Sequence, residues 1–270
     1  MMLDRYRVKE GEPFSLSSVD PGEKTLHADL KKANSLEVLA GMNRRLAELQ
    51  RVLWADGSRA LLVVLQAMDT GGKDGTIRKV MTGVNPQGVD VHGFGVPSDL
   101  ELAHDYLWRI HHRTPAKGRI GIFNRSHYED VLVVRVNELV PDARWSKRYQ
   151  HILDFERLLT DEGTVIRKIM LHISKEEQRN RLQARLLDTS KAYKFNPGDL
   201  ETRERWSEYM EAYEDALSKT STEAAPWYVV PADRKWYRNL VVSQILIEAL
   251  ESLDIAYPRA EEDYSNLVIE

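Results

Sequence analysis

The residues with the clearest chemical meaning form a glycine-rich loop at positions 67–75, AMDTGGKDG, directly after the apolar run 61–67 and before a helical pattern. In a strand-loop-helix arrangement the amide N–H groups of such a loop turn toward an anion, and the helix N-terminus adds partial positive charge. Lys73 can reach phosphoryl oxygens from the same place. The pattern predicts a phosphate-binding loop formed by Gly71, Gly72 and Gly75, with Lys73 as a catalytic residue.

The loop departs from the usual G-x-x-x-x-G-K-[ST] pattern at two positions. Ala67 replaces the first glycine, and Asp74 replaces the Ser or Thr that normally helps to hold magnesium. Asp69 and Asp74 flank Lys73, and either carboxylate could hold magnesium beside a phosphate. Asp74 could equally be a helix-start acid that the helix dipole favours. The alternative for the whole loop is a plain strand-to-helix turn with an exposed lysine.

A second polar group, NRSHYED at 124–130, follows the apolar run RIGIFN at 119–124. Many phosphate-loop proteins carry a magnesium-supporting Asp at the position of Asn124. Asp69, Glu129 or Asp130 must then supply that carboxylate, or the substrate phosphates hold most of the metal.

Two further residues of this group have chemistry of their own. Arg125 can meet a phosphate with its rigid donor fork, and the alternative is a structural ion pair. His127 raises the question of a phosphohistidine, but a lone histidine beside a tyrosine is more often a packed or hydrogen-bonding residue. We therefore expect Arg125 to be catalytic and no covalent intermediate.

Residues 175–200 combine a helical pattern with a polar loop and several basic residues. Arg181 and Arg185 are four residues apart, so they project from the same face of a helix. In phosphate-loop kinases a segment after the fourth strand closes over the phosphates, and its arginines neutralise charge on the transferred group. We expect a lid with both arginines catalytic. The alternative is a solvated helix in which Glu176 and Glu177 pair with the arginines.

Further cations lie at Arg78, Lys79 and Arg109. Cations on helices that border one phosphate loop suit a substrate with many phosphates better than a substrate with two or three. These three residues are therefore candidates for binding a long phosphate chain.

The elements that must position these residues alternate between strands and helices. Strand-like runs lie at 61–67, 89–94, 119–124, 165–173 and 227–232, and helical patterns lie at 35–56, 74–82, 100–113, 146–161, 175–187, 201–219 and 236–253. Such alternation predicts an α/β fold in which a parallel sheet lies between two helical layers. Ligands bind at the carboxyl ends of parallel strands, so the loops after these strands should carry the chemistry.

Length and composition restrict the class of protein. The 270 residues are 42% hydrophobic and 30% charged, which is typical of a folded globular protein, and we expect one domain over 1–270 with an arm and helix at 1–56. The absence of cysteine excludes disulfides, thiolate metal sites and a cysteine nucleophile. A net charge of −4 argues against nucleic acid as a partner. The charged N-terminus and the short apolar runs argue against export and membranes, so a cytoplasmic location is expected.

Several sequence blocks, in this order, resemble the polyphosphate kinase type 2 family. They are AMDTGGKDGTIRKV at 67–80, LWRIHHRTPAKGRIGIFNRSHYEDVLV at 107–133, HISKEEQRNRLQARL at 172–186, YKFNPGDL at 193–200 and PWYVVPADRKWYRNLVVSQIL at 226–246. Together they span most of the chain after residue 60.

The resemblance implies a three-layer α/β/α fold with a lid, and Mg²⁺-dependent, reversible phosphoryl transfer between inorganic polyphosphate and nucleotides. It also implies a homo-oligomer, a dimer or a tetramer. Carried over by position, Asp69 and Lys73 match the functional pair of the phosphate loop, with Asp69 as a metal ligand. Arg125 matches the arginine of the second motif, and Arg181 and Arg185 fall in the lid helix.

The form NRSxYED, with Asn124, resembles the subgroup that phosphorylates both nucleoside monophosphates and diphosphates. We therefore expect conversion of AMP to ADP and of ADP to ATP, with Glu129 among the catalytic residues. Two alternatives share these features. One is an ATP-dependent nucleoside or nucleotide kinase of the same fold, and the other is a non-catalytic nucleotide-binding module.

Overall fold

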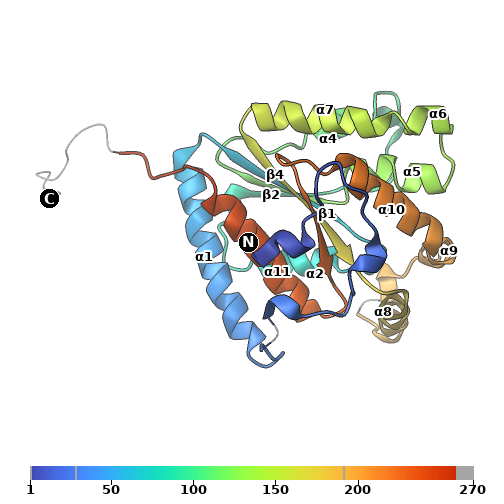
Figure 1. Cartoon of the computed structure of the whole chain (residues 1–270), viewed down its shortest axis with the longest axis horizontal. Helices are drawn as coiled ribbons and strands as arrows, with labels where there is room; N and C mark the ends of the chain where they lie inside the picture. Colours follow the sequence, from blue (N-terminus) through green and yellow to red (C-terminus); the bar gives the residue numbers. More distant parts are fainter. Residues whose placement is uncertain (1, 28, 191, 260–270) are drawn as a thin grey trace, which may run out of the picture.

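The computed structural model describes residues 2–27, 29–190 and 192–259. Residue 191 of the predicted lid and residues 260–270 of the predicted domain lie outside this description. A single five-stranded sheet runs through the centre (Figure 1), in the order β2-β3-β1-β4-β5, and every pairing is parallel. The strands are β1 (Ala60–Gln66), β2 (Val89–Gly93), β3 (Ile120–Asn124), β4 (Thr164–His172) and β5 (Trp227–Pro231). The five predicted strands are confirmed.

Helices cover both faces of the sheet, as Figure 1 shows. One layer contains α1 (Ser35–Asp56), α2 (Lys73–Val80) and α11 (Lys235–Glu251), which contact one another. The opposite layer contains α5 (Val133–Val136), α6 (Asp142–Trp145), α7 (Arg148–Asp161) and α10 (Trp206–Thr220). The predicted three-layer α/β/α sandwich is confirmed.

The central strand β1 determines where the chemistry lies. All seven of its residues are buried, because β3 and β4 flank it and helices cover both faces. Its apolar run without alternation is what such a position requires. The carboxyl ends of β1 and β3 are paired through Leu65 and Asn124, so the loops that follow these strands meet at one edge of the sheet.

Two predicted helices are each divided in two. The segment 100–113 forms α3 (Asp99–Leu102) and α4 (Trp108–His111), because the Asp105 carboxylate accepts a hydrogen bond from the Leu107 amide and makes a turn between them. The segment 201–219 forms α9 (Gly198–Glu204) and α10, because Arg205, with φ −86° and ψ 23°, leaves the helical conformation. Hydrophobic periodicity alone did not reveal either break.

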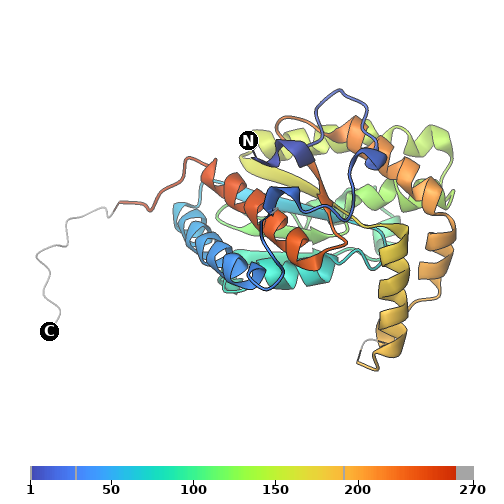
Figure 2. The ribbon, with the colours of Figure 1, turned by 60° about the horizontal axis from the view of Figure 1, so that its bottom comes forward.

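The segment after β4 extends away from the sheet. Helix α8 (Lys175–Leu187) is capped by Ser174, whose hydroxyl accepts a hydrogen bond from the Glu177 amide at 3.0 Å. Figure 2 shows α8 projecting from the body with α9 beside it on the return path. This arrangement is the one expected of a lid at 175–200.

The N-terminal arm packs along the helices and β5 rather than leaving the body. It contains short 3-10 helices at Met2–Tyr6, Leu16–Ser18 and Thr25–His27, and its apolar side chains join the same hydrophobic core as the sheet. An isolated antiparallel bridge joins Arg7 to Tyr228 of β5. Over the described part of the chain, no helix has both the length and the apolar character that crossing a membrane requires.

Candidate active site

The loop between β1 and α2 is a tight turn in which two residues have positive φ angles. Thr70 has φ 60° and Gly72 has φ 101°, and the Gly71 amide donates to the Met68 carbonyl at 2.9 Å. A Cβ added at Gly71 would lie 2.8 Å from the Met68 carbonyl oxygen, so a side chain does not fit there. The predicted sequence of strand, loop and helix is confirmed between residues 60 and 80.

Lys73 is the first residue of α2 and its side chain turns back over the loop. Its Nζ donates to the carbonyl of Ala67 at 2.9 Å, and the residue is buried. Burial lowers the pKa of Lys73, and the nearby Arg125 lowers it further. A phosphate bound beside this buried ammonium would stabilise its positive charge.

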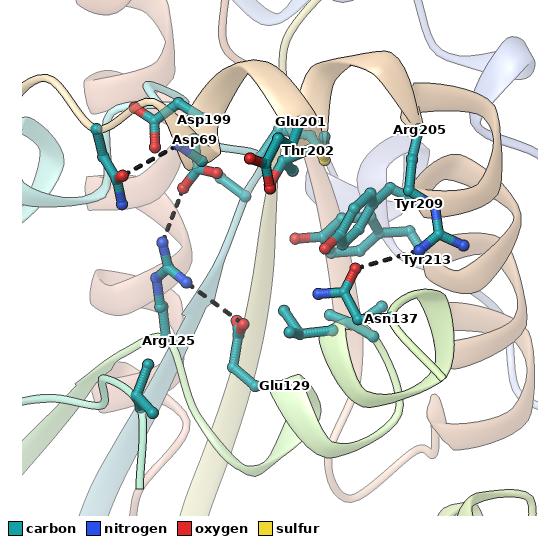
Figure 3. Close-up of a pocket in the computed structure, with 17 residues that line it drawn as sticks. Asp69, Arg125, Glu129, Asn137, Asp199, Glu201, Thr202, Arg205, Tyr209 and Tyr213 are labelled. Atoms are coloured by element: carbon teal, nitrogen blue, oxygen red, sulfur yellow. Dashed lines mark hydrogen bonds and ion pairs between the residues drawn. The ribbon is translucent and has the colours of Figure 1, made fainter. Parts of the chain in front are cut away.

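Arg125 follows β3 in a left-handed backbone conformation, with φ 64°, that non-glycine residues rarely adopt. Its amide donates to the Leu65 carbonyl at the end of β1, at 3.1 Å, which fixes the turn. Its Nη2 lies 2.7 Å from Asp69 Oδ1, and its Nη1 lies 3.5 Å from Glu129 Oε2 (Figure 3). The structure thus brings three of the predicted catalytic residues together.

Asn124 and Asp74, which both replace residues that usually support magnesium, contact each other. The Asn124 side-chain amide, at the end of β3, donates to Asp74 Oδ1, at the start of α2, over 2.8 Å. The usual arrangement has a carboxylate at the strand end and a hydroxyl at the helix start. Here the carboxylate is that of Asp74 at the helix start, and the amide of Asn124 is at the strand end. The pair as a whole therefore still carries one negative charge.

Arg181 of α8, in the segment predicted to be a lid, contacts the phosphate loop directly. Its Nη1 donates to the carbonyls of Thr70 and Gly71 at 3.0 and 3.1 Å. Its Nε forms an ion pair with Glu177 at 2.7 Å. Arg181 therefore links α8 to the loop in this structure.

The second lid arginine, Arg185, faces an acidic residue at the base of α9. Its Nη1 lies 3.0 Å from Asp199 Oδ2. Burial raises the pKa of Asp199, and the neighbouring Asp69 raises it further. Two carboxylates, Asp69 and Asp199, thus lie near each other above Arg125, as the labelled side chains in Figure 3 show.

Two adjoining cavities open at this edge of the sheet. The larger, of about 1170 Å³, is lined by residues 69–75, the ends of β2 and β3, α8 and the start of α11, and we call it the loop cavity. The smaller, of about 470 Å³, is lined by Tyr209, Tyr213 and side chains of α5 and α9, and we call it the tyrosine cavity. They share Asp69, Arg125, Asn196 and Asp199 as common lining residues.

Most of the predicted site residues line the loop cavity. They are Asp69, Gly71, Gly72, Lys73, Asp74, Gly75, Arg78, Asn124, Arg125, Arg181 and Arg185. Glu129 instead lines the tyrosine cavity. Lys79 is exposed on α2 and lines neither cavity.

Arg109 lies behind the loop cavity. Its side chain is buried, its Nη1 donates to the Gly95 carbonyl at 3.0 Å, and its guanidinium lies over the Phe94 ring. In this structure Arg109 supports the cavity wall, because Phe94 and Gly95 line that wall. Its contact with polyphosphate stays a prediction that this geometry does not favour.

His127 is fully buried and has no access to a substrate. It belongs to a buried polar network in which Lys168 Nζ contacts Glu156 at 2.5 Å, the Tyr128 hydroxyl at 3.0 Å and the Thr220 carbonyl at 2.6 Å. Glu156 also accepts from the Tyr128 hydroxyl at 2.8 Å. The network fixes the segment 127–130, which follows Arg125, against the layer of α7 and α10.

Several residues of the site were not predicted. Tyr209 and Tyr213 belong to the buried stripe of α10, where a core residue and a ligand-binding residue look alike in the sequence. Asp199 and Gln178 are ordinary polar residues of helical segments, and the Gln178 side-chain amide donates to the Asp69 carbonyl at 3.2 Å. Arg238 had a detectable signal, because it is a charged residue within the largely buried helix α11.

Comparison with known proteins agrees with this geometry. The family described as Polyphosphate kinase 2 (PPK2) matches residues 29–258. The AMP/ADP-polyphosphate phosphotransferase of Meiothermus ruber is 57% identical over 268 residues, which is 99% of this chain and 100% of that protein. The ADP-polyphosphate phosphotransferase of Rhodopseudomonas palustris is 46% identical, over 94% of this chain and 91% of that protein.

A solved structure has the same fold. The crystal structure of polyphosphate kinase 2 from Arthrobacter aurescens TC1 superposes with a TM-score of 0.91 at 47% sequence identity. The similarity covers 95% of this chain and 92% of that one. The chain therefore belongs to the polyphosphate kinase 2 family.

Proposed function

We propose that this enzyme transfers phosphoryl groups reversibly between inorganic polyphosphate and AMP or ADP, giving ADP or ATP. One observation carries the proposal. The loop cavity and the tyrosine cavity meet at Asp69, Arg125 and Asp199, so a phosphate chain in one and a nucleotide in the other would face each other there.

The loop cavity has the charge that a polyphosphate chain requires. Seven basic and four acidic side chains line it, which leaves an excess of positive charge around the phosphate loop. Arginine and lysine bind phosphate oxygens through charge-assisted hydrogen bonds. The large volume of this cavity, about 1170 Å³, suits a chain of several phosphates.

The tyrosine cavity has the composition expected for a nucleoside. Tyr209 and Tyr213 offer aromatic surface on which a base can stack, and Asn137 offers an amide for its polar edge (Figure 3). Four acidic and two basic side chains line this cavity, and the resulting negative charge disfavours binding of the polyphosphate chain here. We place the acceptor AMP or ADP here, with its phosphates toward Arg125.

In-line transfer between the two substrates requires positioning more than covalent chemistry. Lys73 and Arg125 would bind the oxygens of the transferred group, and Arg181 and Arg185 would neutralise its charge from the lid. Carboxylates and carbonyls hold these cations in the structure, so phosphates would replace Asp69, Glu129 and Asp199 as partners.

Mg²⁺ is the expected cofactor and would offset negative charge on the phosphates. In the described ranges, no group of three or more His, Cys, Asp and Glu side chains is arranged to hold a metal. The phosphate loop still offers two carboxylates, those of Asp69 and Asp74. The Asn124 amide lies beside Asp74. This set fits Mg²⁺, which is commonly bound by one or two carboxylates while phosphates and water complete its shell.

Two features support the use of both AMP and ADP. The chain has Asn124 in the form NRSxYED, and it is 57% identical to the Meiothermus ruber protein, whose name includes AMP and ADP. A homo-oligomeric assembly and a cytoplasmic location stay predictions beside this activity.

A nucleotide panel tests the proposal. The purified enzyme is incubated with Mg²⁺, polyphosphate and either AMP or ADP, with no ATP added, and products are separated by anion-exchange chromatography. ADP and then ATP should form from AMP. No transfer from polyphosphate, together with transfer in a parallel reaction in which ATP replaces polyphosphate, would identify an ATP-dependent kinase. Nucleotide binding without transfer to any acceptor would identify a non-catalytic module.

A further inference from the structure

Arg238 of α11 lies directly beneath the phosphate loop. It is 2% exposed, although it is an arginine in a helix that packs in the apolar layer below the sheet. Its Nε and Nη2 donate to the Asn239 side-chain oxygen at 3.2 and 2.9 Å, and its Nη1 reaches the Gly71 carbonyl at 3.5 Å. The side chain is thus held against the loop and also borders the loop cavity.

The glycines of the loop make room for this guanidinium. A Cβ added at Gly72 would overlap Nη1 of Arg238 and lie 3.1 Å from its Cζ. Gly72 also has φ 101°, which disfavours any other residue. The Gly71–Gly72 turn therefore leaves room for the Arg238 guanidinium, and all three residues line the loop cavity.

The charge of Arg238 has no acidic counterpart nearby. Within residues 2–27, 29–190 and 192–259, no salt bridge joins Arg238 to a carboxylate. The charged group that perturbs it is another cation, Arg181, whose Nη1 also donates to the Gly71 carbonyl. Burial, followed by repulsion from Arg181, lowers the pKa of Arg238 to about 9. A buried cation without a counterion is unfavourable, and an anion in the loop cavity would relieve that cost.

We propose that Arg238 is a positioning residue for phosphate binding. It fixes the Gly71–Gly72 turn from beneath, so that the loop faces its cavity, and it adds positive charge that strengthens the binding of a polyphosphate chain. The inference rests on the proposed function. It adds a residue on a helix far along the chain to the phosphate-binding machinery.

Binding of tripolyphosphate, measured by isothermal titration calorimetry in the presence of Mg²⁺, tests this role. Circular dichroism first shows that each variant is folded. R238Q should bind tripolyphosphate about 10- to 100-fold more weakly than the wild type, which corresponds to about 1.4 to 2.8 kcal/mol. R238K, which retains the charge, should lie between the two.

Arg167 provides a matched control. It is a partly buried arginine on β4 whose pKa is also lowered by burial, but it lies outside both cavities. R167Q should leave tripolyphosphate affinity unchanged. A folded R238Q variant with the affinity of the wild type would overturn the inference. If the wild type itself failed to bind tripolyphosphate and to transfer from polyphosphate, the proposed function would fail, and the inference with it.

A double-mutant cycle tests the contact without relying on R238Q. Gly72→Ala should weaken tripolyphosphate binding strongly in the wild-type background and less in the R238A background, because truncation removes the clash but not the backbone strain. Gly83→Ala controls for that strain, because Gly83 has φ 85° with open space around it. Equal effects of Gly72→Ala in both backgrounds would contradict the proposed contact.

Discussion

Arg125 Nη2 lies 2.7 Å from Asp69 Oδ1, and this ion pair joins the loop after β3 to the loop after β1. The two residues are 56 positions apart in the sequence. The pair lies where the loop cavity and the tyrosine cavity meet. Asp69 thus holds the guanidinium at the place where we expect phosphoryl transfer.

Replacing Arg125 with Lys should reduce kcat/KM for both substrates by about 10²- to 10³-fold, in line with the loss of one donor to a developing charge. Lysine keeps the charge but lacks the planar fork that reaches Asp69 and Glu129 together. Steady-state kinetics with polyphosphate and AMP would measure the change. The control is Arg144→Lys, because Arg144 is exposed on α6. Wild-type kinetics in the Arg125 variant would place the transferred group elsewhere.

Lys73→Ala should lower turnover by orders of magnitude while the protein remains folded, because the substitution removes a buried cation from the phosphate loop without removing core packing. Lys147→Ala, at an exposed position before α7, is the matched control. Activity close to normal in Lys73→Ala would contradict the assignment of the loop.

The lowered pKa of Lys73 predicts that kcat/KM for polyphosphate depends on pH. The pKa of Lys73 is lowered by burial and by Arg125, so the free enzyme should lose this positive charge as the pH rises, at a pH below the usual lysine range. Accordingly, kcat/KM for polyphosphate should be maintained at lower pH and fall along an alkaline limb. Lys73→Arg should move that limb to higher pH. A limb at the same pH in this variant would show that another group titrates.

Tyr209→Leu should raise KM for AMP and ADP by about fivefold or more, since stacking of a base on an aromatic ring contributes about 1 to 3 kcal/mol. KM for polyphosphate should change little, because Tyr209 lines only the tyrosine cavity. Tyr149→Leu is a control, because Tyr149 is a buried tyrosine of α7 outside both cavities. If KM for polyphosphate rose instead, the substrates would be assigned to the wrong cavities.

Asp199→Asn should lower KM for polyphosphate several-fold. The Asp199 carboxylate pairs with Arg185 at 3.0 Å and adds negative charge close to Asp69, so it competes with a phosphate for the lid arginine. Fluorescence-monitored titration with tripolyphosphate would report the same change in affinity without turnover. A weaker affinity in this variant would instead mean that Asp199 holds Arg185 in its binding position.

Lys168→Met should destabilise the fold by about 3 to 5 kcal/mol, because it leaves the Glu156 carboxylate buried without its partner. Burial alone would raise the pKa of Glu156, but the Lys168 ammonium lowers it, so without Lys168 the buried carboxylate charge is uncompensated. Urea denaturation measures the loss. Adding Glu156→Leu to Lys168→Met should recover part of the lost free energy of unfolding. No recovery would show that the unpaired Glu156 carboxylate does not cause the destabilisation.

The sequence by itself determined the sheet and the phosphate loop. The apolar runs of β1, β3 and β4 have no alternation because both faces of the sheet are covered, so the pattern is local and visible. Gly71, Gly72 and Lys73 follow β1 directly, and their chemistry depends on backbone conformations that nearby residues dictate. The strand ends that meet at the active site followed from parallel pairing alone.

Only the tertiary structure decided which distant residues complete the site. Asp199 approaches Arg185 because α9 returns beside α8. Arg238 lies against Gly72 because α11 packs on α2, β4 and β5. Neither approach leaves a periodic signal in the sequence. The breaks at Asp105 and Arg205 also escaped prediction, since one side-chain hydrogen bond or one residue's dihedral angles can end a helix within an unbroken apolar pattern. Long-range packing fixes such contacts, whereas hydrophobic periodicity records only which face of an element is buried.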